Sequence, residues 1–214
     1  MNVSKLAWHF AGIMIAICLV SCQNPGATKQ ENDQDLKVQI DTGMLQGGEE
    51  NGLRVFRNIP FAAPPVGDLR WRPPQAPKAW SGVRDASTYG NYCPQNLRPG
   101  AAEEQLASYE MSEDCLTLNL LTPARSADER LPVMVWILPG AFRQGAPQAP
   151  LYDGTALAQQ GVVMVTFNYR LGILGQIAHP ALSNEQSDEM LGHYALMDQY
   201  AALEWVQRNI AAFG

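Results

Sequence analysis

Residues 133–142 read VMVWILPGAF, and this stretch decides the class of fold that we expect. An apolar run rich in valine and isoleucine ends abruptly in proline, glycine and alanine. Such a run predicts a strand that is covered on both faces, as in α/β proteins. Ligands of open α/β sheets gather at the carboxyl ends of the strands. The small residues that follow the run therefore mark a candidate site.

Small residues at this position matter because they let backbone N–H groups approach a bound molecule closely. Two or three such groups are able to stabilise the oxyanion that forms during acyl transfer. Taken alone, however, a strand that runs into Pro139-Gly140-Ala141 is equally typical of an ordinary strand-to-loop turn. The residues by themselves leave both interpretations open.

Other segments supply further elements of an α/β domain. Apolar runs at residues 115–121 and 162–167 predict two more strands, the second covered on both faces. Residues 153–160 have helical character, which Gly161 ends. A spacing of three to four between apolar residues predicts an amphipathic helix that begins near Leu191 and is capped by Gly214. The apolar face predicted for that helix consists of Leu196, Tyr200, Leu203, Val206 and Ile210.

The amino-terminal part of the domain has a different pattern. Residues 38–45 and 53–61 flank a glycine-rich turn at 47–52, so they predict a small antiparallel hairpin. Residues 63–77 are rich in proline, which cannot donate to a strand ladder. This stretch is therefore predicted to cross the surface without regular structure.

The first residues predict export and lipid attachment. Lys5 precedes an apolar run at residues 10–20, which is shorter than the ~20 residues that a transmembrane helix needs. The run ends in Leu19-Val20-Ser21-Cys22, which resembles a bacterial lipobox. We therefore expect a lipoprotein signal peptide at residues 1–21 and a lipid on Cys22 that anchors the chain to a cell-envelope membrane. A plain secretory signal with an incidental cysteine is the alternative.

After the signal, residues 22–36 are polar with almost nothing to bury, so they predict a flexible tether to a domain at 37–214. Cys93 and Cys115 are the two cysteines that remain for this domain. In an exported protein such a pair favours a disulfide, worth about 3 kcal/mol by the loop-entropy estimate. Two unpaired buried cysteines are the alternative.

Composition argues against one class of function. The net charge is −6, and lysine and arginine form no cluster along the chain. A nucleic-acid-binding protein needs a basic surface that neutralises phosphates. We therefore expect no nucleic-acid partner.

Five blocks, in order along the chain, resemble the carboxylesterase type B family, which includes cholinesterases and bacterial para-nitrobenzyl esterases. The blocks are FRNIPFAAPPVG at 56–67, LRWRPP at 69–74, SEDCLTLN at 112–119, NYRLG at 168–172 and LMDQYAALEWVQRNI at 196–210. The resemblance implies an α/β-hydrolase fold. It also implies hydrolysis of small-molecule carboxylic esters by a triad of serine, acid and histidine, with no metal or organic cofactor.

The resemblance also places roles on particular residues. The family's oxyanion loop falls on residues 138–142, with the backbone N–H groups of Gly140 and Ala141 as donors. Its first disulfide falls on Cys93 and Cys115. Where relatives usually have an aromatic residue or histidine followed by glycine, this chain has Leu138-Pro139. Proline lacks an N–H and restricts the residue before it, which leaves the path of the loop open.

The triad itself has no counterpart in these residues. No G-x-S-x-G pentapeptide, the family's nucleophile motif, occurs in the 214 residues, and the nucleophile is expected beyond Gly214. The sequence thus predicts an α/β-hydrolase fold truncated before the nucleophile strand, with a small hairpin and the first strands and helices of the central sheet. Such a chain is expected to be inactive alone. The alternative function is a non-catalytic, lipid-anchored binding or adhesion protein of the same family, which the unusual Leu138-Pro139 favours.

Three other polar residues are interpreted as structural. His179 and His193 precede the expected position of the nucleophile, whereas the family's histidine follows it, so both are expected to be structural or surface residues. Asp198 is interpreted as a helix carboxylate that fixes a neighbouring turn.

Overall fold

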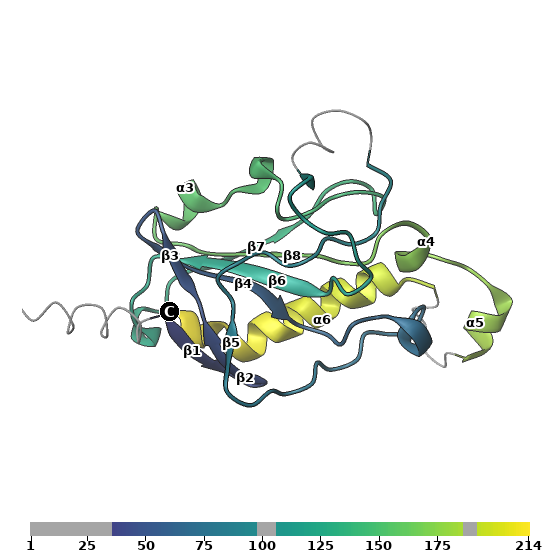
Figure 1. Cartoon of the computed structure of the whole chain (residues 1–214), viewed down its shortest axis with the longest axis horizontal. Coiled ribbons are helices and arrows are strands. Elements are labelled where there is room, and N and C mark those ends of the chain that lie inside the picture. Colours follow the sequence, from purple (N-terminus) through teal and green to yellow (C-terminus); the bar gives the residue numbers. More distant parts are fainter. Residues whose placement is uncertain (1–35, 98–105, 186–191) are drawn as a thin grey trace, which may run out of the picture.

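The computed structural model describes residues 36–97, 106–185 and 192–214 (Figure 1). The predicted signal peptide, Cys22 and nearly all of the predicted tether lie outside the described residues. In the part of the chain that is described, no helix combines the length and apolar character needed to cross a membrane.

A five-stranded sheet with the order β3-β4-β6-β8-β7 forms the centre of the fold. Its strands are β3 (Gly48–Glu50), β4 (Leu53–Pro60), β6 (Thr117–Thr122), β8 (Val163–Phe167) and β7 (Val133–Ile137). Neighbours pair antiparallel except for β7 and β8, which run parallel with Val135 opposite Val165. The predicted strands at 115–121, 133–138 and 162–167 are thus confirmed.

A second, three-stranded sheet has the order β1-β2-β5. Its strands are β1 (Lys37–Ile40), β2 (Gly43–Gln46) and β5 (Val83–Asp85). β1 and β2 form a hairpin, and β2 pairs parallel with β5. The prediction of one strand at 38–45 was wrong, because the chain reverses at residues 41–42 and makes two strands there. The hairpin around the glycine-rich turn instead joins β3 and β4.

The helices are mostly short and connect strands. They are α3 (Thr155–Ala158), α4 (Gly172–Gly175), α5 (Pro180–Glu185) and α6 (Tyr194–Asn209), with 3-10 turns at Gly67–Leu69, Ala127–Glu129, Pro150–Tyr152 and Ile210–Phe213. The long helix α6 runs along the larger sheet in Figure 1. The proline-rich residues 63–77 form no strand, as predicted.

The prediction that Gly214 caps the long helix was wrong. α6 ends at Asn209, and Gly214 instead caps the 3-10 turn Ile210–Phe213 that follows it. The chain tightens from an α-helix to a 3-10 turn at this point, and the tighter turn carries the buried Phe213. Gly214 has φ of 105°, a conformation that favours glycine at the end of a turn.

The main core lies between the larger sheet and α6. Trp205 of α6 and Phe213 after it are fully buried, and Phe213 packs edge-on against Phe56 of β4 at 5.0 Å between ring centroids. Phe61 and Phe167 make a second edge-on pair at 6.1 Å. Burying a side chain of this size contributes about 1.5–3 kcal/mol, so Trp205 and Phe213 fix α6 against the sheet.

Two predictions about burial were wrong, one of them in part. The first was that the strand at 133–138 is covered on both faces; β7 is the edge strand of the described sheet, and Val133, Met134, Trp136 and Ile137 are all at least 40% exposed. The second, the predicted apolar face of α6, was wrong only in part: Leu196 and Leu203 are exposed and Tyr200 is 65% exposed, whereas Val206 is buried and Ile210 packs against the core. The buried face of α6 carries Met197, Ala202 and Trp205 in addition to Val206.

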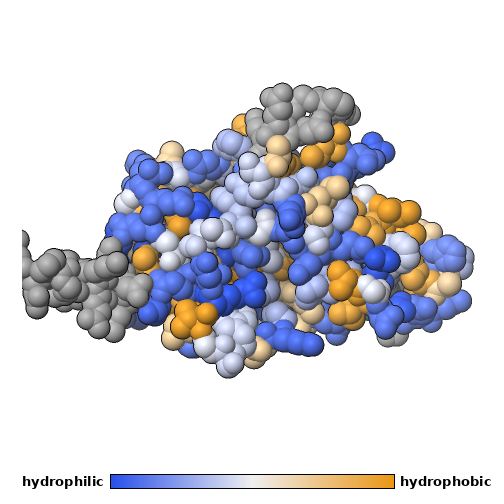
Figure 2. Space-filling view, viewed as in Figure 1, coloured by the Kyte–Doolittle hydropathy of each residue, from blue (hydrophilic) through white to orange (hydrophobic). Residues whose placement is uncertain are grey.

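The visible surface is mixed in character. On the face shown in Figure 2, hydrophobic residues form small separate patches among polar ones. Exposed apolar side chains of β7 and α6 contribute to the hydrophobic part of the molecular surface.

Candidate functional site

The candidate loop, residues 138–142, follows β7 directly at its carboxyl end. Its backbone has three consecutive residues with positive φ, namely Gly140 (123°), Ala141 (52°) and Phe142 (58°). A Cβ on Gly140 would lie 1.8 Å from the backbone oxygen of Gln144, so no larger residue fits there without a shift. The loop is therefore a tight turn that brings backbone, not side chains, to the end of the strand.

The amide groups of this turn form a candidate anion site. Among the hydrogen bonds of the described residues, none uses the backbone N–H of Gly140 or Ala141 as a donor. The carbonyl of Gly140 is occupied, since it accepts the N–H of Arg143 at 3.0 Å. Ala141 is exposed and Gly140 is half-buried. Two adjacent donors are thus available to a bound oxygen atom.

The segment after β8 fixes both ends of the loop. The Tyr169 hydroxyl donates to the carbonyl oxygen of Leu138 at 2.6 Å, and the Gly172 N–H donates to that of Phe142 at 2.7 Å. The Phe142 ring packs edge-on against Tyr169. Burial raises the pKa of the Tyr169 hydroxyl, which keeps it protonated as a donor. The NYRLG block thus positions the loop.

The unusual Leu138-Pro139 is accommodated at the start of the loop. The Leu138 side chain is buried in the main core, whereas Pro139 is exposed. Proline has no N–H to contribute, but the two candidate donors lie after it. Pro139 therefore does not remove either candidate N–H group, that of Gly140 or that of Ala141.

Asp198 has the structural role that was predicted for it. It is fully buried in α6 and accepts three hydrogen bonds from Arg170: from the backbone N–H at 3.0 Å, from Nε at 2.8 Å and from Nη2 at 2.7 Å. Arg170 also donates from Nη1 to the carbonyl of Arg72. Burial raises the pKa of the Asp198 carboxyl, and the hydrogen bonds from Arg170 oppose that rise. The pair fixes the segment between β8 and α4.

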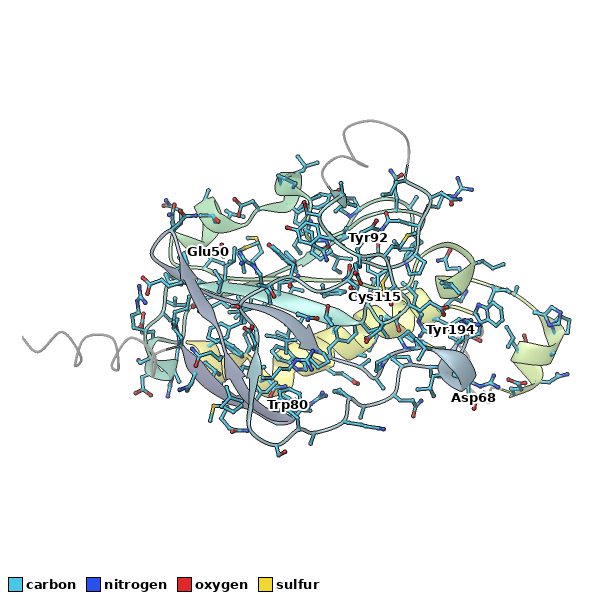
Figure 3. The ribbon with its side chains drawn as sticks, viewed as in Figure 1. Glu50, Asp68, Trp80, Tyr92, Cys115 and Tyr194 are labelled. Atoms are coloured by element: carbon cyan, nitrogen blue, oxygen red, sulfur yellow. A yellow bond between two sulfur atoms is a disulfide. The ribbon has the colours of Figure 1, made fainter. Side chains whose placement is uncertain are left out.

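The predicted disulfide is present. Cys93 and Cys115 are bonded to each other and fully buried. Figure 3 shows Cys115 near Tyr92, on the two chain segments that the bond joins. Tyr92 also forms a β-bridge with Met111, so the two segments are paired on the amino-terminal side of the bond as well.

Two cavities flank the candidate loop. One, of about 540 Å³, is lined by Arg143, Leu171 and Gly172 among others. The other, of about 170 Å³, has a wall that includes Gly140 and Tyr152. Gln95 and Gln144 line both cavities. A molecule bound in either space would lie beside the turn.

Neither histidine contributes to these cavities. His179 and His193 both lie outside the linings, and His193 stands at the amino-terminal end of α6. Within the described ranges, no cluster of three or more histidine, cysteine or acidic side chains is arranged to hold a metal ion.

Gly214, beyond which the nucleophile is expected, has a structural role and supplies no catalytic group. Its carbonyl oxygen accepts the N–H of Leu131 at 2.6 Å, so it holds the segment that leads into β7. A Cβ on Gly214 would lie 2.2 Å from that of Ala124, which leaves room for glycine alone. The expected position of the nucleophile lies outside the described residues and stays a prediction.

Three contributors to the site did not emerge from sequence reasoning. Tyr169 lies within the NYRLG block, but its contact with Leu138 depends on the pairing of β7 with β8. Gly145 and Gln95 meet across 50 residues of sequence. The one feature of the sequence that could have identified Gln95 was its position two residues after Cys93.

Residues 34–214 match the model of the Carboxylesterase family. The chain belongs to the carboxylesterase family. It is 46% identical over 213 residues to the fumonisin B1 esterase of Sphingopyxis macrogoltabida, covering 100% of this chain and 37% of that protein. It is also 46% identical over 182 residues to the para-nitrobenzyl esterase of Bacillus subtilis (strain 168), covering 83% of this chain and 35% of that one.

Solved carboxylesterases share the fold. A carboxylesterase of Geobacillus stearothermophilus superposes with a TM-score of 0.72 at 40% identity, over 84% of this chain and 35% of that one. A structure of PNB esterase gives a TM-score of 0.73 at 42% identity, over 84% of this chain and 36% of that one. The described residues thus form part of an α/β-hydrolase fold, and the chain spans little more than a third of the carboxylesterases it matches.

Proposed function

We propose that this chain supplies the oxyanion-stabilising part of a carboxylic ester hydrolase. The observation that carries the proposal is the pair of backbone N–H groups at Gly140 and Ala141, which have no acceptor among the described residues and lie at the carboxyl end of β7 in a member of the carboxylesterase family. When a nucleophile attacks an ester carbonyl, the carbonyl oxygen gains negative charge. Two N–H donors held in advance stabilise that charge, and losing one such donor typically lowers kcat by about 10²–10³.

The nucleophile belongs to another part of the proposed enzyme. A serine in G-x-S-x-G, with its acid and histidine, would complete the triad, and these 214 residues contain no such pentapeptide. We therefore assign ester hydrolysis to a longer product that continues beyond Gly214, and inactivity to residues 1–214 alone.

Hydrolysis of p-nitrophenyl butyrate tests this assignment. Residues 22–214 alone are expected to release p-nitrophenol no faster than buffer, whereas a longer product of the gene that includes G-x-S-x-G is expected to hydrolyse the ester. A longer product that folds and lacks activity towards a panel of carboxylic esters would support the non-catalytic binding alternative. Turnover by residues 22–214 that is lost on Gly140→Ala substitution would contradict the assignment of the nucleophile.

The substrate class we propose is a small-molecule carboxylic ester. The names of the two relatives at 46% identity point to different esters, fumonisin B1 and a para-nitrobenzyl ester. Equal identity to both means that overall similarity does not select one ester. The proposal therefore rests on the shared reaction, attack on an ester carbonyl.

We further propose that Cys22 carries a lipid that anchors the chain to a cell-envelope membrane. The support is the sequence Leu19-Val20-Ser21-Cys22 after a short apolar run. In a bacterial host supplied with radiolabelled palmitate, the chain is expected to become labelled and to sediment with membranes. Cys22→Ser should abolish the label, and Cys18→Ser serves as the matched control that keeps it. A label that persists in Cys22→Ser would contradict the anchor.

A further inference from the structure

Gln95 bridges two loops that are distant in sequence. Its side-chain oxygen Oε1 accepts the N–H of Gly145 at 2.8 Å, and its Nε2 donates to the carbonyl of Gly145 at 2.9 Å. Nε2 also donates to the carbonyl of Cys93 at 3.1 Å. The amide side chain thus pairs with Gly145 as a neighbouring strand would, while remaining attached to its own loop.

The loop that carries Gln95 is itself firmly held. Cys93, two residues earlier, is bonded to Cys115, which lies just before β6 of the larger sheet. The backbone N–H of Gln95 donates to the sulfur of Met111 at 3.3 Å. Because Gln95 is fixed on the side of the disulfide, its contact with Gly145 holds the second loop against a rigid support.

Gly145 in turn contacts the start of the candidate oxyanion turn. A Cβ on Gly145, which has φ of 141°, would lie 2.9 Å from the carbonyl oxygen of Pro139. The Gln144 carbonyl approaches Gly140 even more closely. Backbone therefore packs directly on backbone between residues 144–145 and 139–140. A shift of Gly145 is transmitted to Gly140 without an intervening side chain.

We propose that Gln95 is a positioning residue that couples the orientation of the Gly140 and Ala141 amides to the Cys93–Cys115 disulfide. The catalytic meaning of this coupling rests on the proposed function, whereas the bridge itself rests on the hydrogen bonds. Opening the disulfide or removing the side-chain amide is expected to loosen the turn while the sheet stays folded.

Amide hydrogen exchange measures the bridge directly. In Gln95→Ala the Gly145 N–H is expected to exchange on the order of tenfold faster, because it loses its acceptor and the loop loses a second bond. The amides of β8 should keep their protection. Reduction of the disulfide in the unaltered chain should also speed the exchange of Gly145. Asn96→Ala, at the exposed neighbouring position, is the matched control and should leave Gly145 unchanged.

Gln95→Glu provides a readout that a purely structural role would not give. In its neutral form the new carboxyl accepts the Gly145 N–H and donates to one carbonyl, much as glutamine does. In its ionised form it cannot donate and it faces the carbonyl oxygens of Gly145 and Cys93. Protection of Gly145, corrected for the intrinsic pH dependence of exchange, should therefore be high at low pH and fall as the carboxyl ionises. The NMR signals of Pro139, Gly140 and Ala141 should shift with the same pH midpoint.

Titration with acetate tests the oxyanion donors of the proposed function separately from the Gln95 bridge. In the unaltered chain, titration with acetate should move the amide proton signals of Gly140 and Ala141, and Gln95→Ala should weaken that response on the order of fivefold. No response in the unaltered chain, with Gly145 exchange still dependent on Gln95, would refute the oxyanion donors and leave the bridge intact.

Unchanged Gly145 exchange in Gln95→Ala would overturn the bridge. If Gln95→Ala also loses protection in β8, its Gly145 result is no longer specific to the bridge. The pH titration of Gln95→Glu then provides the test, because the neutral and ionised forms of the carboxyl are compared within one protein. A Gly145 amide that does not respond to the ionisation would then refute the coupling.

Discussion

Arg170→Met is expected to lower the free energy of unfolding by about 3–5 kcal/mol, because it leaves a buried carboxylate without its partner. The Arg170 and Asp198 side chains are 3% and 0% exposed. The substitution removes both side-chain hydrogen bonds to Asp198 and the one to the carbonyl of Arg72. Urea denaturation at pH 7, followed by circular dichroism, measures the loss.

Two further variants separate the buried charge from other causes. Arg208→Met removes an ion pair with Asp41 whose side chains are 48% and 37% exposed, so its cost should stay below about 1 kcal/mol. In the double variant Arg170→Met/Asp198→Leu no unpaired charge is left buried at this position, and most of the lost stability should return. A double variant as unstable as Arg170→Met would show that shape, and not the unpaired charge, dominates.

The loss of unfolding free energy in Arg170→Met should also depend on pH. Burial raises the pKa of Asp198, and in Arg170→Met the side-chain hydrogen bonds and the positive charge that oppose this rise are gone, while the backbone N–H of residue 170 remains. A carboxyl whose pKa is higher in the folded than in the unfolded state favours folding when it is protonated. That contribution is complete below the unfolded value of about 3.9 and is lost as pH rises through the folded value. The gap between Arg170→Met and the unaltered chain should therefore narrow from pH 7 towards pH 4.

The strands were predictable because apolar runs are local signals, but their burial was not. β8 has strands on both sides and is buried throughout, whereas β7, with a similar composition, is the edge strand. Which of two apolar strands lies at an edge depends on strand order, and strand order is a property of the whole chain. The same local pattern therefore gave one correct and one wrong prediction.

The face of α6 was mispredicted for a related reason. Apolar residues occur on more than one side of this helix, and the predicted stripe joined the exposed Leu196, Tyr200 and Leu203 to Val206 and Ile210, which do pack in the core. The side that is buried includes Asp198, a residue that hydropathy places at the surface. Its partner Arg170 lies 28 residues earlier, so the pairing that makes burial tolerable is invisible to helical periodicity.

The candidate site was predictable to the extent that it is made of backbone in a recognisable block. Resemblance located Gly140 and Ala141 because the loop follows a strand at a fixed position. The supports of the loop were not found, since Gln95 and Tyr169 act across 50 and 31 residues of sequence. Side chains that hold a loop from a distance carry no local pattern.

Gly140→Ala is expected to cost about 3 kcal/mol or more and to displace the turn that carries the candidate donors. Two penalties add. A φ of 123° is unfavourable for any residue with a Cβ, and that Cβ would overlap the backbone oxygen of Gln144 at 1.8 Å. Thermal unfolding measures the cost, and amide exchange at residues 140–145 locates the displacement.

Gly161→Ala is the matched control, because it separates the two penalties. Gly161 has φ of 90°, but no atom lies within 4 Å of the position of its Cβ. Its substitution should carry the backbone penalty alone, roughly 1–2 kcal/mol. The excess cost of Gly140→Ala then measures how tightly residues 144–145 hold the turn. Equal costs for the two variants would mean that the Gln144 carbonyl moves aside freely. The turn would then not be a preorganised site, because donors that shift with their support cannot be held ready for the developing charge.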